Sequence, residues 1–159
     1  VSVYSKQKNA YLQNLVLQKR ARFGKQLLFA RQAGMRPVVK SLRECRPFYY
    51  FTDQDWTTKD GVFVPFFGIP AATLATLPRL VKMANAKVVP CIARVLPDYK
   101  GYEVRFYPAW ENYPTDDLIA DTRRINEFIE QRVLEMPEQY FWLHKRFKTR
   151  PEGEESFYK

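Results

Sequence analysis

Residues 61–78 read GVFVPFFGIPAATLATLP and form the longest uncharged run of the chain. A membrane-spanning helix needs about 20 consecutive apolar residues, and two prolines and a glycine interrupt this run. Proline lacks the backbone donor that a helix interior requires. The run therefore predicts a buried strand, Val62–Phe67, followed by a helix over Ala71–Ala86, rather than a segment that crosses a bilayer.

Strand-like and amphipathic segments alternate on both sides of this run. Helical spacing of apolar residues predicts helices over Asn9–Phe23 and over residues 115–136, the second capped by Thr115. Pro37, whose fixed φ suits a first turn, opens a shorter helix that ends at Arg43. Further strands are expected at residues 1–4, 26–30, 47–52, 87–96 and 102–107. The alternation predicts an α/β fold, with one mixed, mainly parallel sheet flanked by helices.

The length of 159 residues suits one domain or the larger part of one. No internal repeat or low-complexity linker divides the sequence. It begins at Val1, inside an apolar run and without an initiator methionine. We therefore expect the chain to be a piece of a longer polypeptide.

The positive charge is concentrated in the first quarter of the chain. The formal net charge is +9, and residues 1–43 hold ten lysines and arginines but no acidic residue. A block of one sign attracts anions, such as nucleic acid, an anionic lipid surface or an acidic carrier protein. The alternative is a solvated basic face with no specific partner.

Two carboxylates follow the aromatic segment Pro47–Thr52. Asp53 and Asp55 stand in the sequence TDQDW, where the expected strand ends. Ligands of open α/β sheets bind outside the carboxyl ends of strands, so this turn is a candidate site. An ordinary Asx turn is the alternative interpretation.

Residues 137–153, PEQYFWLHKRFKTRPEG, join an aromatic cluster to a run of cations. Aromatic rings bury large apolar areas, while closely spaced arginines and lysines hold phosphate or carboxylate groups. The combination suits a ligand with an apolar body and an anionic head. A solvated run of charge is the alternative. The four cations are Lys145, Arg146, Lys148 and Arg150.

His144 is the chain's only histidine. A general base needs an orienting partner, usually a carboxylate. The nearest acidic residues, Glu138 and Glu152, show no motif spacing to it. Because cations follow it, we expect a neutral imidazole that donates a hydrogen bond rather than a base.

Five segments together resemble the Kdo-dependent lipid A lauroyl and myristoyl acyltransferases, the late acyltransferases of lipopolysaccharide biosynthesis. The likeness runs from Val1 to Tyr158. The turn FTDQDW is similar to the family's Pro-Asp-x-Asp-aromatic turn. The other segments are VYSKQKN (3–9), VFVPFFGIPAATLATLPRL (62–80), FYPAWENYPTDD (106–117) and PEQYFWLHKRFKTRPEGE (137–154).

The resemblance implies that residues 1–159 are the C-terminal part of a single acyltransferase domain with a glycerolipid-acyltransferase-like fold. It implies transfer of a fatty acyl chain from acyl carrier protein to a lipid A precursor at the cytoplasmic face of the inner membrane. An anionic membrane surface is then a further partner. No cofactor, metal or nucleic acid is expected.

The family's hallmark is a His-x4-Asp/Glu pair, in which the histidine deprotonates the acceptor hydroxyl. The chain lacks this pair, because Thr149 stands five residues after His144. We expect the pair upstream of Val1, and the 159-residue chain to be inactive alone.

The resemblance carries a small set of residues into this sequence. It assigns Asp53 and Asp55 to the catalytic group. It assigns the four cations between residues 145 and 150, here called the terminal block, to substrate binding. Ser5 stands where the family has an arginine that contacts phosphate, and Lys6 is a candidate replacement. Two alternatives remain: an acyltransferase for another glycolipid or a glycerophospholipid acceptor, and a basic module that binds nucleic acid through residues 1–43. The predicted substrate-binding residues are Lys145, Arg146, Lys148, Arg150 and Lys6.

Overall fold

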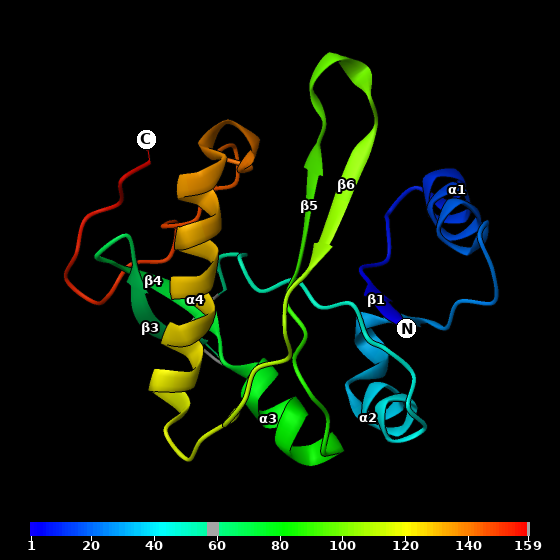
Figure 1. The fold of residues 1–159 in the computed structure, drawn as a ribbon, viewed down its shortest axis with the longest axis horizontal. Coiled ribbons are helices and arrows are strands. Elements are labelled where there is room, and N and C mark those ends of the chain that lie inside the picture. The colour runs from blue at the N-terminus through cyan, green and yellow to red at the C-terminus, as the bar shows by residue number, and fades with distance from the viewer. Residues whose placement is uncertain (57–60, 159) are drawn as a thin grey trace. The chain divides into compact units, whose positions relative to one another are not determined.

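The computed structural model describes residues 1–56 and 61–158. The chain forms two compact units, one made of Val1–Tyr50 with Met83–Ala86 and the other of Phe51–Lys82 with Lys87–Lys159. Both units contain helices and short strands (Figure 1), so the predicted mixture of α and β structure is confirmed. Within the described residues, no helix is both long and apolar enough to cross a bilayer.

A small parallel sheet opens the first unit. Strands β1 (Ser2–Tyr4) and β2 (Leu28–Ala30) pair in parallel, with Val3 opposite Phe29. Parallel neighbours need a crossover connection, which helix α1 (Ala10–Ala21) supplies. The side chain of Asn9 caps α1 by accepting hydrogen bonds from two backbone N–H groups. The two predicted strands and the predicted helix are confirmed.

The strand predicted over Pro47–Thr52 does not form. The Val1 nitrogen donates to the Pro47 carbonyl at 2.8 Å, and the Tyr49 N–H donates to the Val1 carbonyl at 3.2 Å. These two bonds join the start of the segment to the first residue of the chain. No described strand pairs with the rest of this aromatic segment, so it stays irregular.

Helix α2 (Arg36–Arg43) follows a short 3₁₀ turn, η1 (Arg31–Ala33). Pro37 lies in its first turn, as predicted, where a missing N–H costs nothing. Val38 and Ser41 are buried, and the Ser41 hydroxyl donates to the Pro37 carbonyl. The helix therefore buries one face and leaves its cations outside.

The second unit is built on a hairpin of β3 (Gly61–Phe66) and β4 (Ile69–Leu74). Phe67 and Gly68 have φ values of 50° and 77°, which is the geometry of a two-residue type I′ turn. The turn folds Ile69–Leu74 back onto β3. The helix predicted over Ala71–Ala86 is therefore wrong at its start, and α3 spans Thr76–Ala84.

A second hairpin joins β5 (Cys91–Val95) to β6 (Tyr102–Phe106) through the 3₁₀ turn η2 (Pro97–Tyr99). It extends as a two-stranded ribbon (Figure 1). The first strand begins later than predicted, after Pro90, which has no N–H for a ladder bond.

The described strands thus form three separate two-stranded sheets, of which one is parallel. A single mixed, mainly parallel sheet is not confirmed. Sequence alternation indicates that strands and helices follow one another, but it does not fix which strands pair.

Helix α4 (Leu118–Glu135) packs against β3 and is followed by the 3₁₀ turn η3 (Pro137–Gln139). Thr122, Ile125 and Val133 of its predicted stripe are buried. The predicted cap is wrong: Asp117, not Thr115, accepts hydrogen bonds from the first turn. Thr115 instead donates to the buried carboxylate of Asp121.

Candidate functional site

Side chains from α4 close the open edge of β3. Asn126 Nδ2 and Arg123 Nη1 donate to the Pro65 carbonyl at 2.9 Å and 3.1 Å. The Phe67 N–H donates to Glu130 Oε1 at 3.0 Å. An unpaired strand edge exposes backbone groups that need partners, and the helix supplies them here.

Two arginines of the terminal block close the open edge of β4. Arg150 Nη1 donates to the Pro70 carbonyl at 2.7 Å, and Arg146 Nη1 donates to the Ala72 carbonyl at 2.8 Å. Arg146 Nη2 also donates to Thr73 Oγ1 at 2.6 Å. Residues far apart in sequence are thus joined at one strand, and the terminal block has a fixed path.

Arg146 is the most buried cation of the block, with 3% of its surface exposed. Its guanidinium lies 5.4 Å from the Phe66 ring centroid and 3.4 Å from Asn126 Oδ1. Burial lowers the pKa of Arg146, while the charges of Tyr140, Asp55 and Asp53 act in the opposite direction. The geometry favours an internal role for this side chain, and its predicted contact with substrate stays a prediction.

The other predicted cations differ in their surroundings. Arg150 contacts the Phe157 ring at 4.2 Å and pairs with Glu154. Lys145 Nζ lies over the Tyr158 ring at 5.3 Å, and both Lys145 and Lys148 are exposed. Lys6 is exposed in the other unit. The structure therefore leaves Lys145, Lys148 and Lys6 open to an anion.

Asp55 is fixed to the terminal block. Its carboxylate accepts from the Thr149 N–H at 3.1 Å and from Thr149 Oγ1 at 2.9 Å. Its own N–H donates to His144 Nε2 at 2.8 Å. A ring nitrogen that accepts carries no proton, so His144 is neutral at this nitrogen, as expected. His144 accepts this hydrogen bond through Nε2, and the expectation that it also donates one stays a prediction.

We expect the Asp55–Thr149 pair to stabilise the fold measurably. Asp55→Ala and Thr149→Val should each lower the free energy of unfolding by about 1–3 kcal/mol, because each leaves partly buried polar groups without partners. A double-mutant cycle in urea should give a coupling energy above about 0.5 kcal/mol. The matched control combines Asp53→Ala with Thr149→Val, and a coupling as large as that of Asp55 would contradict the assignment.

Asp53 differs from Asp55 in its hydrogen bonding. It is half-buried, and its carboxylate accepts no hydrogen bond from the residues that the structure describes. Burial, together with the negative charge of Asp53, raises the pKa of Tyr140 to about 12. Asp53 therefore lies within electrostatic reach of Tyr140 and Arg146, with its oxygens still available to a ligand.

The model of the bacterial lipid A biosynthesis acyltransferase family matches residues 1–149 of the chain. The chain belongs to this family. The match covers the Asp53 turn, both hairpins and α4, together with the terminal block as far as Thr149.

Several lipid A acyltransferases are similar over most of the chain. It is 35% identical to the lipid A biosynthesis lauroyltransferase of Escherichia coli K12 over 159 residues, which are 99% of the chain and 51% of that protein. It is 41% identical to the myristoyltransferase of the same organism over 145 residues, covering 88% and 43%. The palmitoleoyltransferase matches at 36% over 126 residues, covering 79% and 41%. The chain spans about half the length of these relatives.

In this family member, sequence reasoning missed the neutral residues of the site. Asn126 and Thr73 are fully buried and join the arginine to both strands of the hairpin. Asn126 follows Ile125 of the predicted stripe, so a polar residue on a buried helix face was the available signal. Thr149 carried no signal, since its partner Asp55 is 94 residues away. Among the described residues, no cluster of three potential metal ligands occurs.

Proposed function

We propose that the chain is the C-terminal part of an enzyme of lipopolysaccharide biosynthesis that transfers a fatty acyl chain from acyl carrier protein to a lipid A precursor. Its relatives include lauroyl-, myristoyl- and palmitoleoyltransferases of lipid A biosynthesis. The ten cations of residues 1–43 support an acidic carrier protein and an anionic membrane surface as partners. We place the enzyme at the cytoplasmic face of the inner membrane, with a glycerolipid-acyltransferase-like fold.

The proposed reaction is acyl transfer from a thioester to an alcohol. The acceptor hydroxyl oxygen attacks the thioester carbonyl carbon, and a base takes the hydroxyl proton. The C–O bond forms, the C–S bond breaks, and the carrier thiolate leaves and is protonated. The reaction consumes neither an oxidant nor a metal ion.

The carboxylate of Asp53, which accepts no hydrogen bond from the described residues, is the observation that supports this chemistry for the chain. Asp55 is fully engaged by Thr149, whereas Asp53 accepts nothing from the described residues and lies near a buried arginine. A carboxylate placed in this way can orient a base or accept a hydrogen bond from the acceptor. We propose that Asp53 belongs to the catalytic group and that Asp55 holds the turn in place through Thr149. Phosphate binding is then a role for the exposed Lys145 and Lys148.

The chain alone should transfer no acyl group, because His144 has no acid five residues after it and binds the Asp55 backbone. A positioned base typically contributes about 10²–10⁴-fold. We expect activity to return in a chimera in which this chain replaces the matching half of the Escherichia coli lauroyltransferase. The substrates to use are the thioester of acyl carrier protein, radiolabelled in its acyl chain, and a phosphorylated lipid A precursor.

Two results would contradict the proposal. One is turnover by the 159-residue chain itself above the uncatalysed rate. The other is a folded chimera that acylates a glycerophospholipid but not the lipid A precursor, which would select the alternative acceptor.

A further inference from the structure

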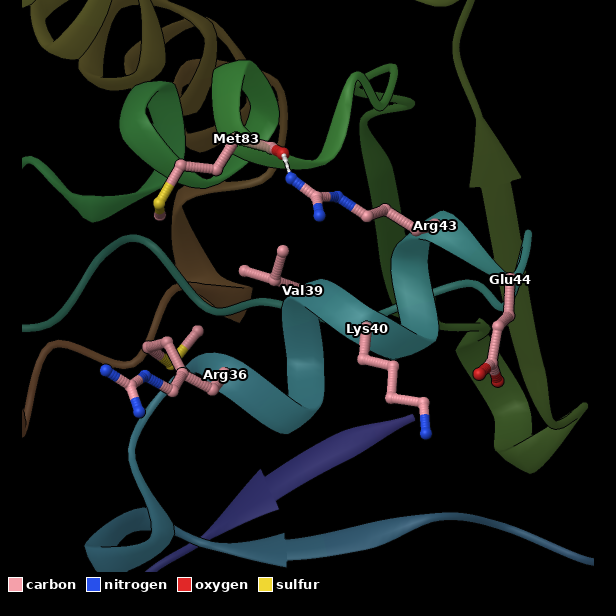
Figure 2. Close-up of a pocket in the computed structure, with 7 residues that line it drawn as sticks. Arg36, Val39, Lys40, Arg43, Glu44 and Met83 are labelled. Carbon is pink, nitrogen blue, oxygen red and sulfur yellow. Dashed lines mark hydrogen bonds between the residues drawn. The ribbon is translucent and has the colours of Figure 1, made fainter.

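The first unit contains a cavity of about 620 Å³ beside α2. Figure 2 shows Val39 on the helix, with Arg36 and the end of α3 at Met83 around it. Met35 completes the apolar part of the lining. Methionine side chains are unbranched and polarisable and fit irregular apolar ligands.

The same cavity carries an excess of positive charge. Arg36, Lys40 and Arg43 line it together with a single acid, Glu44. Glu44 is already paired with Arg46 at 3.2 Å. Arg43 donates to the Met83 carbonyl at 2.8 Å and closes one end (Figure 2). Within the described part of the chain, Arg36 and Lys40 form no ion pair, so they remain available to an anion.

We propose that this cavity binds a lipid through its phosphate head, with the first part of an acyl chain against the apolar lining. Arg36 contacts the phosphate through paired N–H groups, which a guanidinium offers and an ammonium does not. The Lys40 side chain extends away from Arg36 (Figure 2), so it adds attraction at longer range rather than a second contact. Met35, Val39 and Met83 contact the chain. None of these residues belongs to the Asp53 site.

The cavity's volume of about 620 Å³ lies within the range of about 300–1,000 Å³ for small-molecule sites and fits a lipid head with several methylenes. Two sources supply this chemistry, a membrane phospholipid and a phosphorylated glycolipid acceptor. Lipid binding to this cavity does not depend on acyl transfer, so its absence would leave the proposed activity untouched.

The chain's three methionines provide the readout. Met35 and Met83 line the cavity, and Met136 follows α4 in the other unit. Titration of methyl-¹³C-methionine protein with monomeric dihexanoylphosphatidic acid should shift the Met35 and Met83 methyl signals and leave Met136 unchanged. Dihexanoylphosphatidylcholine and inorganic phosphate should give at least tenfold weaker binding, because the first is zwitterionic and the second lacks an acyl chain.

Matched substitutions test the cations. Arg36→Gln should weaken binding of the phosphatidic acid at least fivefold and Lys40→Gln should weaken it less, whereas Lys8→Gln, an exposed cation outside the cavity, should not weaken it. A diacylated glucosamine phosphate separates the two sources: tighter binding than phosphatidic acid indicates the acceptor glycolipid, and equal or weaker binding indicates a membrane phospholipid. Unchanged Met35 and Met83 signals with both lipids, or shifts produced only by acyl carrier protein, would overturn the proposal.

Discussion

Arg146→Ala is expected to lower the free energy of unfolding by about 3 kcal/mol or more, the largest loss from any one cation of the terminal block. The substitution removes the arginine donor from the buried Ala72 carbonyl and from Asn126 Oδ1, and it removes one of the two donors to the Thr73 hydroxyl. Each unsatisfied buried polar group costs about 1–3 kcal/mol. Urea unfolding followed by circular dichroism measures the change.

The block provides its own controls. Lys145→Ala and Lys148→Ala remove exposed cations and should change stability by less than about 0.5 kcal/mol. Arg146→Lys should recover only part of the loss, since one ammonium cannot reach the carbonyl and the hydroxyl as a planar fork does. An Arg146→Ala protein that unfolds at the wild-type urea concentration would return Arg146 to the predicted role of substrate contact.

Local patterns in the sequence predicted the elements that local physics determines. The apolar stripe of α4, the helix α1 and the strands β3 and β6 follow from spacing over a few residues. The β3–β4 turn was missed because Phe67 adopts a positive φ that glycine or asparagine usually takes. With the turn unrecognised, residues after Pro70 were assigned to the following helix.

The candidate site was harder to predict than the elements, because its contacts join distant residues. The composition of the terminal block indicated binding of an anion, yet Arg146 and Arg150 bind carbonyl groups of β4 instead. A run of cations is the same in sequence whether its partners are phosphates or backbone oxygens. Asp53 and Asp55 likewise look equivalent in TDQDW, and only the position of Thr149 distinguishes them.

The different hydrogen bonding of Asp53 and Asp55 leads to the second large expected effect, which is on activity. In the active chimera with the lauroyltransferase half, Asp53→Asn should reduce acyl transfer at least tenfold, a barrier increase of about 1.4 kcal/mol. The amide keeps the size of the side chain but removes the charge that would orient the catalytic base or the acceptor hydroxyl. Stability should change little, because no described residue donates a hydrogen bond to this carboxylate.

Asp55→Asn in the same chimera is the matched comparison. It alters a carboxylate two residues away that accepts two hydrogen bonds from Thr149, so its main effect should be a lower midpoint of unfolding. Activity measured below that midpoint should fall less than in Asp53→Asn. The two substitutions therefore separate a charge used in the reaction from a charge used in folding. Near-normal turnover by Asp53→Asn would make Asp53 an ordinary turn residue, and equal losses of activity and stability in both variants would show that the turn acts only as a structural unit.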